Sequence, residues 1–262
     1  IMPYMPRQYM SAEKFLTSQN ALNIVTADDQ ARIKSYQFYD DAYHNRPETF
    51  KVVLRGDDES SEIYIPSAKR IVDATARFLA VNFNFVVDPD NIVTNDNAKS
   101  ATTQAFKDLF KREGLYSKFV TQKKYGLSRG DHVWHVTADD TKPQGTRLSI
   151  NTLYPGSWFP IEDPAEPKRT IGVHIVDVVQ DPREKDAKKS VARRQTYRKT
   201  QDRNGNWTTP ITSSLSLWEL GTWDDRNLSA DEMKLVQWIK PQFNLPNTIT
   251  AIPVYHIANN VP

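Results

Sequence analysis

The spacing of apolar residues changes near Gly126, from the period of a helix to the alternation of strands. Residues 115–125 predict a helix that ends at Gly126, and residues 131–136, Asp-His-Val-Trp-His-Val, predict a strand. Further strands are predicted on either side of a proline-rich corner at 154–161, over residues 147–150 and 169–179. Helices precede this point and strands follow it. The order predicts an α+β fold, with N-terminal helices followed by an antiparallel β-rich region, rather than the parallel sheet of a nucleotide-binding domain.

Three helices are expected before this point. The first runs from Asp28 or Asp29 to about Tyr43, the second begins near Ser67, and the third spans about 99–113 and ends at Gly114. The second helix is amphipathic, and the residues that share one face are Ile71, Thr75, Phe78, Leu79 and Asn82. The third is expected to bury Phe106, Leu109 and Phe110.

Short strands and turns complete the predicted layout. The remaining strands are expected at 50–54, 83–87, 191–201, 215–220, 234–240 and 253–257, with a hairpin turn at 204–206. We expect an N-terminal arm over residues 1–26 and one α+β domain over residues 27–262.

Composition narrows the class of protein further. The chain has 262 residues, enough to bury a core, and no cysteine, which excludes disulfides and thiol chemistry and favours a reducing compartment. Its most apolar helix carries Arg70, Asp73 and Arg77, so no membrane contact is expected. The formal net charge of +2 is small for a dedicated duplex-DNA binder. No secretory signal is visible, and we expect the gene product to begin before Ile1.

Two patterns could indicate a metal site, and each has a simpler explanation. His132 and His135 lie three apart on a predicted strand, where they point to opposite faces and cannot bind one ion together. The acidic pairs lie in predicted loops, where turn and cap roles are commoner than a two-metal nuclease site; they are Asp57-Asp58, Asp139-Asp140 and Asp224-Asp225. We expect no metal site.

One pattern could indicate a nucleophile. Gly126-Leu127-Ser128-Arg129-Gly130 has the G-x-S-x-G spacing of a serine-hydrolase elbow, in which a strand enters the turn and a helix leaves it. Here a helix enters and a strand leaves, so a helix end followed by a turn is the better explanation. No glycine-rich phosphate loop occurs. We therefore expect neither a catalytic residue nor a cofactor site.

Two groups of residues are candidates for contacts with other molecules. A cation-rich segment could contact a phosphate backbone or an acidic partner through Lys188, Lys189, Arg193, Arg194, Arg198 and Lys199. The alternative is a solvated loop and strand edge, since lysines also protect exposed strands from unwanted pairing. The proline-rich corner is expected to be a rigid bend that packs strands within and between subunits, through Tyr154, Pro155, Trp158, Phe159 and Pro160.

Five passages share their order with one known family. They are residues 36–44 (Tyr-Gln-Phe-Tyr-Asp-Asp-Ala-Tyr-His), 68–87, 115–136, 154–179 with the proline-rich corner, and 252–260 (Ile-Pro-Val-Tyr-His-Ile-Ala-Asn-Asn). Together they resemble the N-terminal half of the portal proteins of tailed bacteriophages. The glycine that this family has at the end of the first passage is absent here.

The resemblance implies a structural subunit, mainly the wing, of a ring of about twelve copies at one capsid vertex. Double-stranded DNA would pass through the ring without sequence specificity. The implied partners are the terminase, the major capsid or scaffold protein and head–tail adaptors. The ring would assemble in the bacterial cytoplasm and remain in the virion. The terminase would supply the energy, so no enzymatic activity is implied. The stem, clip and crown would follow Pro262, beginning with a long helix.

Two other functions stay open at this point. One is a metal-dependent nucleic-acid-processing enzyme of a mobile element that uses the loop carboxylates. The other is a different virion adaptor protein.

Overall fold

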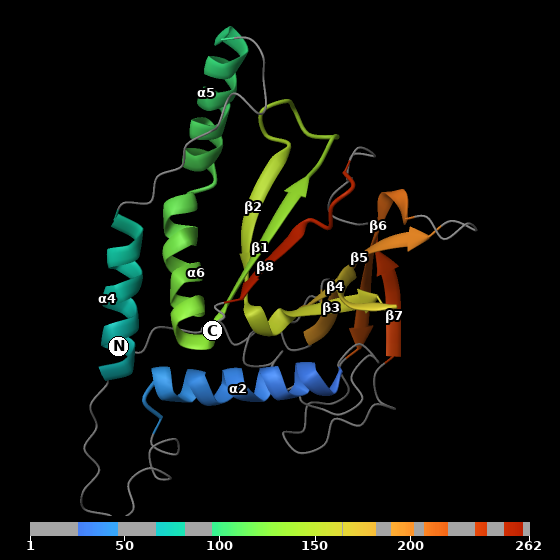
Figure 1. The fold of residues 1–262 in the computed structure, drawn as a ribbon. Helices are drawn as coiled ribbons and strands as arrows, with labels where there is room; N and C mark the ends of the chain where they lie inside the picture. The colour runs from blue at the N-terminus through green and yellow to red at the C-terminus, as the bar shows by residue number, and fades with distance from the viewer. Residues whose placement is uncertain are drawn as a thin grey trace, which may run out of the picture.

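Helices lie beside two antiparallel sheets in this chain (Figure 1), which confirms the predicted α+β class. The structure is a computed structural model that describes residues 26–46, 67–81, 96–163, 165–181, 190–201, 207–219, 234–239 and 249–258. Several expectations lie outside these ranges, namely most of the N-terminal arm, the strands at 50–54 and 83–87 and the turn at 204–206.

The helices of the described part precede the strands. They are α2 (Ala27–Tyr43), α4 (Ser67–Val81), α5 (Asp96–Arg112) and α6 (Leu115–Arg129). A capping box starts α2: the Thr26 hydroxyl accepts the backbone N–H of Asp29 at 3.1 Å, and the Asp29 carboxylate accepts that of Thr26 at 3.2 Å. Gly114, with φ of 58°, separates α5 from α6 as predicted.

The end of α6 corrects one prediction. Gly126 does not end the helix, which continues to Arg129 and stops at Gly130, where φ is 88°. Gly126 lies inside the helix, and a Cβ added there would meet the His132 ring at 2.0 Å. The glycine therefore makes room for a neighbouring side chain rather than for a turn.

The strands form two antiparallel sheets. The three-stranded sheet has the order β2-β1-β8, with β2 (Leu148–Leu153), β1 (Asp131–Ala138) and β8 (Val254–Ala258). The five-stranded sheet follows chain order, with β3 (Trp158–Asp163), β4 (Glu166–Gln180), β5 (Ser190–Gln201), β6 (Trp207–Glu219) and β7 (Lys234–Ile239). The last strand thus returns to pair with the first.

The predicted corner contains a strand that the sequence pattern did not indicate. A short 3-10 helix, η2 (Pro155–Ser157), leads directly into β3, which pairs with β4. Pro160 is tolerated within β3 because, in the described part of the chain, this strand forms the edge of its sheet, where a missing N–H breaks no outer ladder bond.

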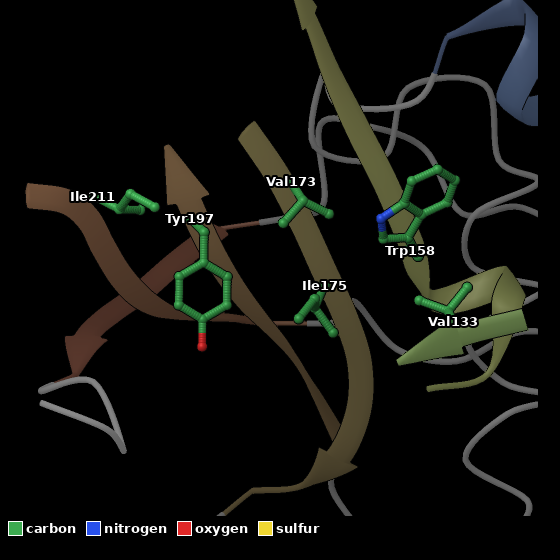
Figure 2. Packing of buried hydrophobic residues seen from close by; sticks show 6 residues of the cluster. All are labelled: Val133, Trp158, Val173, Ile175, Tyr197 and Ile211. Atoms are coloured by element: carbon green, nitrogen blue, oxygen red, sulfur yellow. The ribbon is translucent and has the colours of Figure 1, made fainter. Parts of the chain in front are cut away.

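The core lies between the two sheets (Figure 2). Val133 of the first sheet and Trp158 at the start of β3 belong to the same cluster as four buried residues of the larger sheet, Val173, Ile175, Tyr197 and Ile211. On the helical side, α6 contacts β1 and β2, and α4 packs against α6 (Figure 1). No helix in the described part of the chain is long and apolar enough to cross a membrane.

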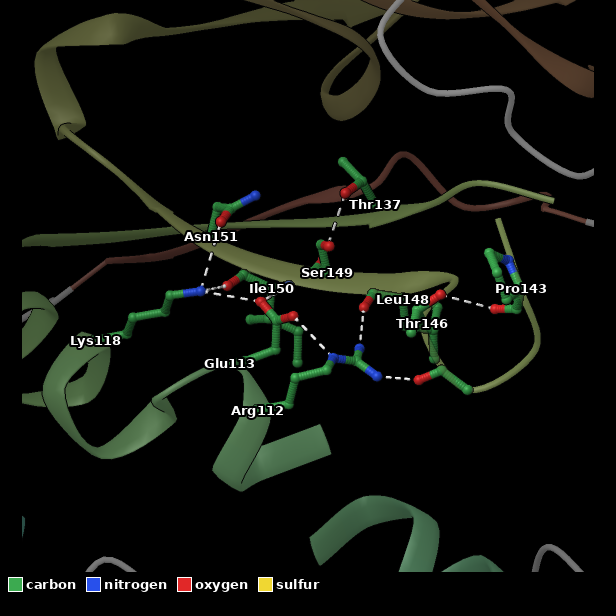
Figure 3. A network of polar contacts seen from close by, with 11 residues as sticks. Arg112, Glu113, Lys118, Thr137, Pro143, Thr146, Leu148, Ser149, Ile150 and Asn151 are labelled. Carbon is green, nitrogen blue, oxygen red and sulfur yellow. Dashed lines mark hydrogen bonds and ion pairs between the residues drawn. The ribbon is translucent and has the colours of Figure 1, made fainter. Parts of the chain in front are cut away.

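A polar network joins the turn between α5 and α6 to strand β2 (Figure 3). The Glu113 carboxylate accepts the backbone N–H of Ile150 at 3.2 Å and pairs with Lys118 at 3.0 Å. Arg112 donates to the carbonyl of Leu148. Burial acts to raise the pKa of Glu113, but the hydrogen bonds from Lys118 and Ile150 outweigh it, and the pKa is lowered.

Two helices do not bury the residues that their sequence pattern indicated. In α4, Ala76 and Ala80 are fully buried, whereas Phe78 is 78% exposed, so its apolar face lies outside. The small side chains of Ala76 and Ala80 let α4 approach α6 closely, so the alanine face of α4 packs against α6. In α5, Leu109 is buried as expected, but Phe106 is exposed.

Candidate functional site

The proline-rich corner lies where the two sheets meet. The turn η2 contacts both β1 of the first sheet and β4 of the second. Of the predicted corner residues, Pro160 is half-buried and four are buried, namely Tyr154, Pro155, Trp158 and Phe159. The structure therefore brings these residues together, and it places the four buried ones for packing inside the subunit.

Arg32 connects helix α2 to the corner. Its guanidinium donates to the carbonyl oxygens of Pro155 at 2.8 Å and Trp158 at 2.7 Å. It also donates to the Asp29 carboxylate at 2.7 Å and lies 5.3 Å from the centre of the Trp158 ring. A single cation thus satisfies two backbone carbonyls of a tight turn, and it fixes the direction of α2 relative to β3.

Asp131, the first residue of β1, accepts hydrogen bonds from two distant elements. One donor is the Tyr36 hydroxyl of α2, and the other is Nε2 of His256 in β8, at 2.7 Å. The His256 ring also stacks on Trp158, with centroids 4.3 Å apart. We call Arg32, Tyr36, Asp131, Trp158 and His256 the junction, because they join α2, β1, β3 and β8.

Charge and burial in the junction favour a structural role. Burial acts to raise the pKa of Asp131, but the hydrogen bonds from His256 and Tyr36 outweigh it, and the pKa is lowered. Burial also raises the pKa of Tyr36, so its hydroxyl stays protonated and donates. An ionised carboxylate with two fixed donors holds elements in place and has no proton to exchange near neutral pH.

A buried ion pair fixes α6 against α2. Arg129 pairs with Asp40, and both side chains are almost fully inaccessible to solvent. The guanidinium also lies 4.9 Å from the centre of the Tyr154 ring. Removal of Asp40 would leave the buried Arg129 without its ion-pair partner, and removal of Arg129 would leave Asp40 with only longer contacts to His44 at 3.6 Å and Arg46 at 3.9 Å.

The elbow-like pattern at 126–130 forms the end of α6 and its glycine stop, which confirms that a helix enters and a strand leaves. The Ser128 hydroxyl donates to the carbonyl of Lys124 at 2.7 Å, as hydroxyls inside helices commonly do. The observed geometry is that of a helix end rather than a nucleophile turn.

The two histidines of β1 point to opposite faces, as predicted. The His132 ring packs against Gly126 of α6. His135 faces the other sheet, with Nε2 2.9 Å from the Tyr197 hydroxyl. Among the described residues, no three His, Asp or Glu side chains are grouped to hold a metal ion.

The acidic pair at 139–140 follows β1 in a turn, as expected. The Asp139 carboxylate accepts the backbone N–H of Thr141 at 3.1 Å and its hydroxyl at 2.6 Å. The other two acidic pairs, at 57–58 and 224–225, lie outside the described ranges.

The predicted cationic residues do not form one patch in the described part of β5. Arg193 pairs with Asp177 at 3.0 Å, and its neighbour Arg194 points to the opposite face, 4.8 Å from the Trp218 ring. Burial lowers the pKa of Arg194. Arg198 is exposed and Lys199 is half-buried, whereas Lys188 and Lys189 lie outside the described residues. Contact with phosphate or an acidic partner stays a prediction.

Sequence patterns missed the junction because its members are far apart in the chain. Tyr36 lies 95 residues before Asp131, and His256 lies 125 residues after it. Local periodicity carries no information about such pairs. Four of the five junction residues lie in the passages set out above, but no local pattern pairs them with one another.

Comparison of the chain with known proteins adds no identification. Neither a model of a known protein family nor a curated protein matches it.

Proposed function

We propose that this chain is a structural subunit of a viral portal ring, mainly its wing, at the capsid vertex. It acts through contacts with neighbouring copies and with virion and packaging proteins, and its ring is the conduit for DNA packaging and ejection. Terminase, capsid or scaffold protein and head–tail adaptors are its proposed partners, and the virion is its proposed location.

One observation carries the proposal. Four of the five portal-like passages supply a residue to the junction: Tyr36, Asp131, Trp158 and His256. These passages therefore meet in one packed unit, which agrees with a resemblance that runs along the chain in a fixed order.

The exposed apolar side chains support the oligomeric part of the proposal. Large apolar residues on α4 are solvent-exposed in the single chain. Contiguous exposed apolar surface commonly marks a protein–protein contact. A ring subunit requires such contacts on both of its sides.

The mass of the full-length gene product in solution tests the proposal. Multi-angle light scattering is expected to give a single species of about twelve subunits, the copy number that the portal resemblance implies for a closed ring. A monomer at all concentrations up to the solubility limit would refute it. Magnesium-dependent cleavage of plasmid DNA that disappears on Asp139→Ala/Asp140→Ala would support the enzyme instead.

A further inference from the structure

The outer face of α4 carries a continuous apolar stripe. Ile71, Ala74, Phe78 and Val81 are all exposed and recur at intervals of three and four residues, so they lie along one side of the helix. Ile71 is 64% and Val81 is 68% exposed. In Figure 1, α4 lies at the outer left edge of the molecule, with α6 on its inner side.

Charge makes this stripe asymmetric. Arg70 and Arg77 are exposed and precede Ile71 and Phe78 by one residue, so both lie along one flank of the stripe. The opposite flank carries apolar side chains, including the exposed Leu79. A surface that covers the stripe must therefore offer apolar groups at its centre and carboxylates along one side.

The same face of a second copy does not meet this requirement. A two-fold contact runs the two α4 helices either antiparallel, with their arginine flanks facing one another, or parallel, with each arginine flank against the apolar flank of the other helix. Neither arrangement brings carboxylates to the arginines. Like charges across a contact repel. The stripe thus fits a different surface of a neighbouring copy, as in a head-to-tail arrangement.

The turn between β3 and β4 offers such a surface. Residues 162–166 hold three carboxylates and no cation, and Glu162 and Glu166 are exposed. Arg169 lies 3.6 Å from Glu166 and neutralises part of this charge. Ile161, just before the turn, is half-buried and lies on the edge strand β3, which adds an apolar side. The tip of β3 lies on the opposite side of the molecule from α4 in Figure 1.

We propose that the α4 stripe of one copy binds the acidic β3–β4 turn of the next copy, head to tail. This inference rests on the proposed function, in which copies form a ring. Two different patches on opposite sides of one subunit are what a heterologous contact needs to generate a closed ring. The apolar stripe supplies buried area, and the arginines select the acidic turn and fix the register.

A charge-exchange experiment on the full-length gene product tests the contact. Arg70→Glu/Arg77→Glu and Glu162→Lys/Glu166→Lys are each expected to reduce the assembled fraction at fixed concentration at least about tenfold. The chain with all four substitutions is expected to assemble again, because its α4 flank and its turn have exchanged signs. Assembly is read from light scattering, and circular dichroism confirms that each variant monomer is folded.

An apolar substitution with a matched control provides the second arm. Phe78→Asp is expected to reduce assembly at least about tenfold, since it places a charge in the covered stripe. Phe106→Asp, at an exposed Phe of α5, is expected to assemble as the wild type does. Equal loss in both variants would overturn the assignment of α4.

The outcomes separate this contact from the proposed function. If the wild-type product assembles but the fourfold charge exchange does not restore assembly, the contact is wrong and the ring proposal stands. If the wild-type product remains monomeric, both fail.

Discussion

Acidification is expected to destabilise this fold through one buried histidine. His135 is 5% exposed and faces the larger sheet from β1, where its Nε2 meets the Tyr197 hydroxyl. Burial, together with the charge of Arg193, lowers its pKa from 6.5 to about 4. Between these two values the unfolded chain binds a proton that the folded chain excludes. The contribution of neutral, buried His135 to the free energy of unfolding is therefore fully present above pH 6.5, and it is lost as the pH falls from 6.5 toward 4.

The size of the effect follows from the two pKa values. Each pH unit below the unfolded-state pKa of 6.5 lowers the free energy of unfolding by about 1.4 kcal/mol. At pH 5, His135 alone therefore lowers it by about 2 kcal/mol. A typical domain has a free energy of unfolding of about 5–15 kcal/mol. One group could thus remove a substantial part of the stability, which makes the effect measurable.

Urea unfolding of wild type and His135→Gln at pH 7.5, 6 and 5 isolates this group. The amide of Gln can bond to Tyr197 but cannot take up a proton, and other titrating groups, including His174 with a pKa of about 4, cancel in the difference. The free energy of unfolding of the wild type minus that of His135→Gln is expected to fall by about 2 kcal/mol from pH 7.5 to pH 5. Parallel pH profiles would refute the assignment of a protonation-resistant His135.

Two further substitutions test the packing of α6. Gly126→Ala is expected to cost about 1–3 kcal/mol of the free energy of unfolding, because the new methyl group overlaps the His132 ring. Thermal denaturation should show most of this cost relieved in a His132→Ala background, and additive effects would contradict the overlap. Arg129→Met is expected to cost about 3–5 kcal/mol, because it leaves Asp40 buried and charged. The control Arg46→Met, at a more exposed partner of Asp40, should cost about 1 kcal/mol or less, and equal costs would refute the distinction.

Sequence periodicity predicted the elements whose signals are local. The alternation at 131–136 correctly indicated a strand, and from it followed the opposite directions of His132 and His135. Gly114 was recognised as a helix boundary because a left-handed conformation favours glycine. These features depend on residues within a few positions of one another.

Other features depend on contacts that periodicity does not contain. The apolar spacing of α4 indicated an amphipathic helix, but it did not show that Ala76 and Ala80 would face α6 while Phe78 stayed outside. Apolar residues recur at the same three- and four-residue intervals on a helix face that stays exposed as on a face that is buried in the core. A rigid bend was expected around Pro160, and β3 forms there nonetheless because its outer edge has no neighbour in the described part of the sheet.

The candidate site, too, was predictable from the sequence only in its local features. The corner was noticed from its prolines and aromatic residues, and four of the five named residues are buried in the single chain. The contacts of the corner with α2 through Arg32, and with β8 through His256, could be found only in the three-dimensional structure. The cationic segment looked continuous in sequence, yet strand geometry sends Arg193 and Arg194 to opposite faces.

Negative-stain electron microscopy of the full-length gene product tests the central claim most directly. Class averages are expected to show closed rings with rotational symmetry and a central channel wide enough for double-stranded DNA. Fields of single particles of monomer size, or open filaments without a closed form, would contradict a portal subunit.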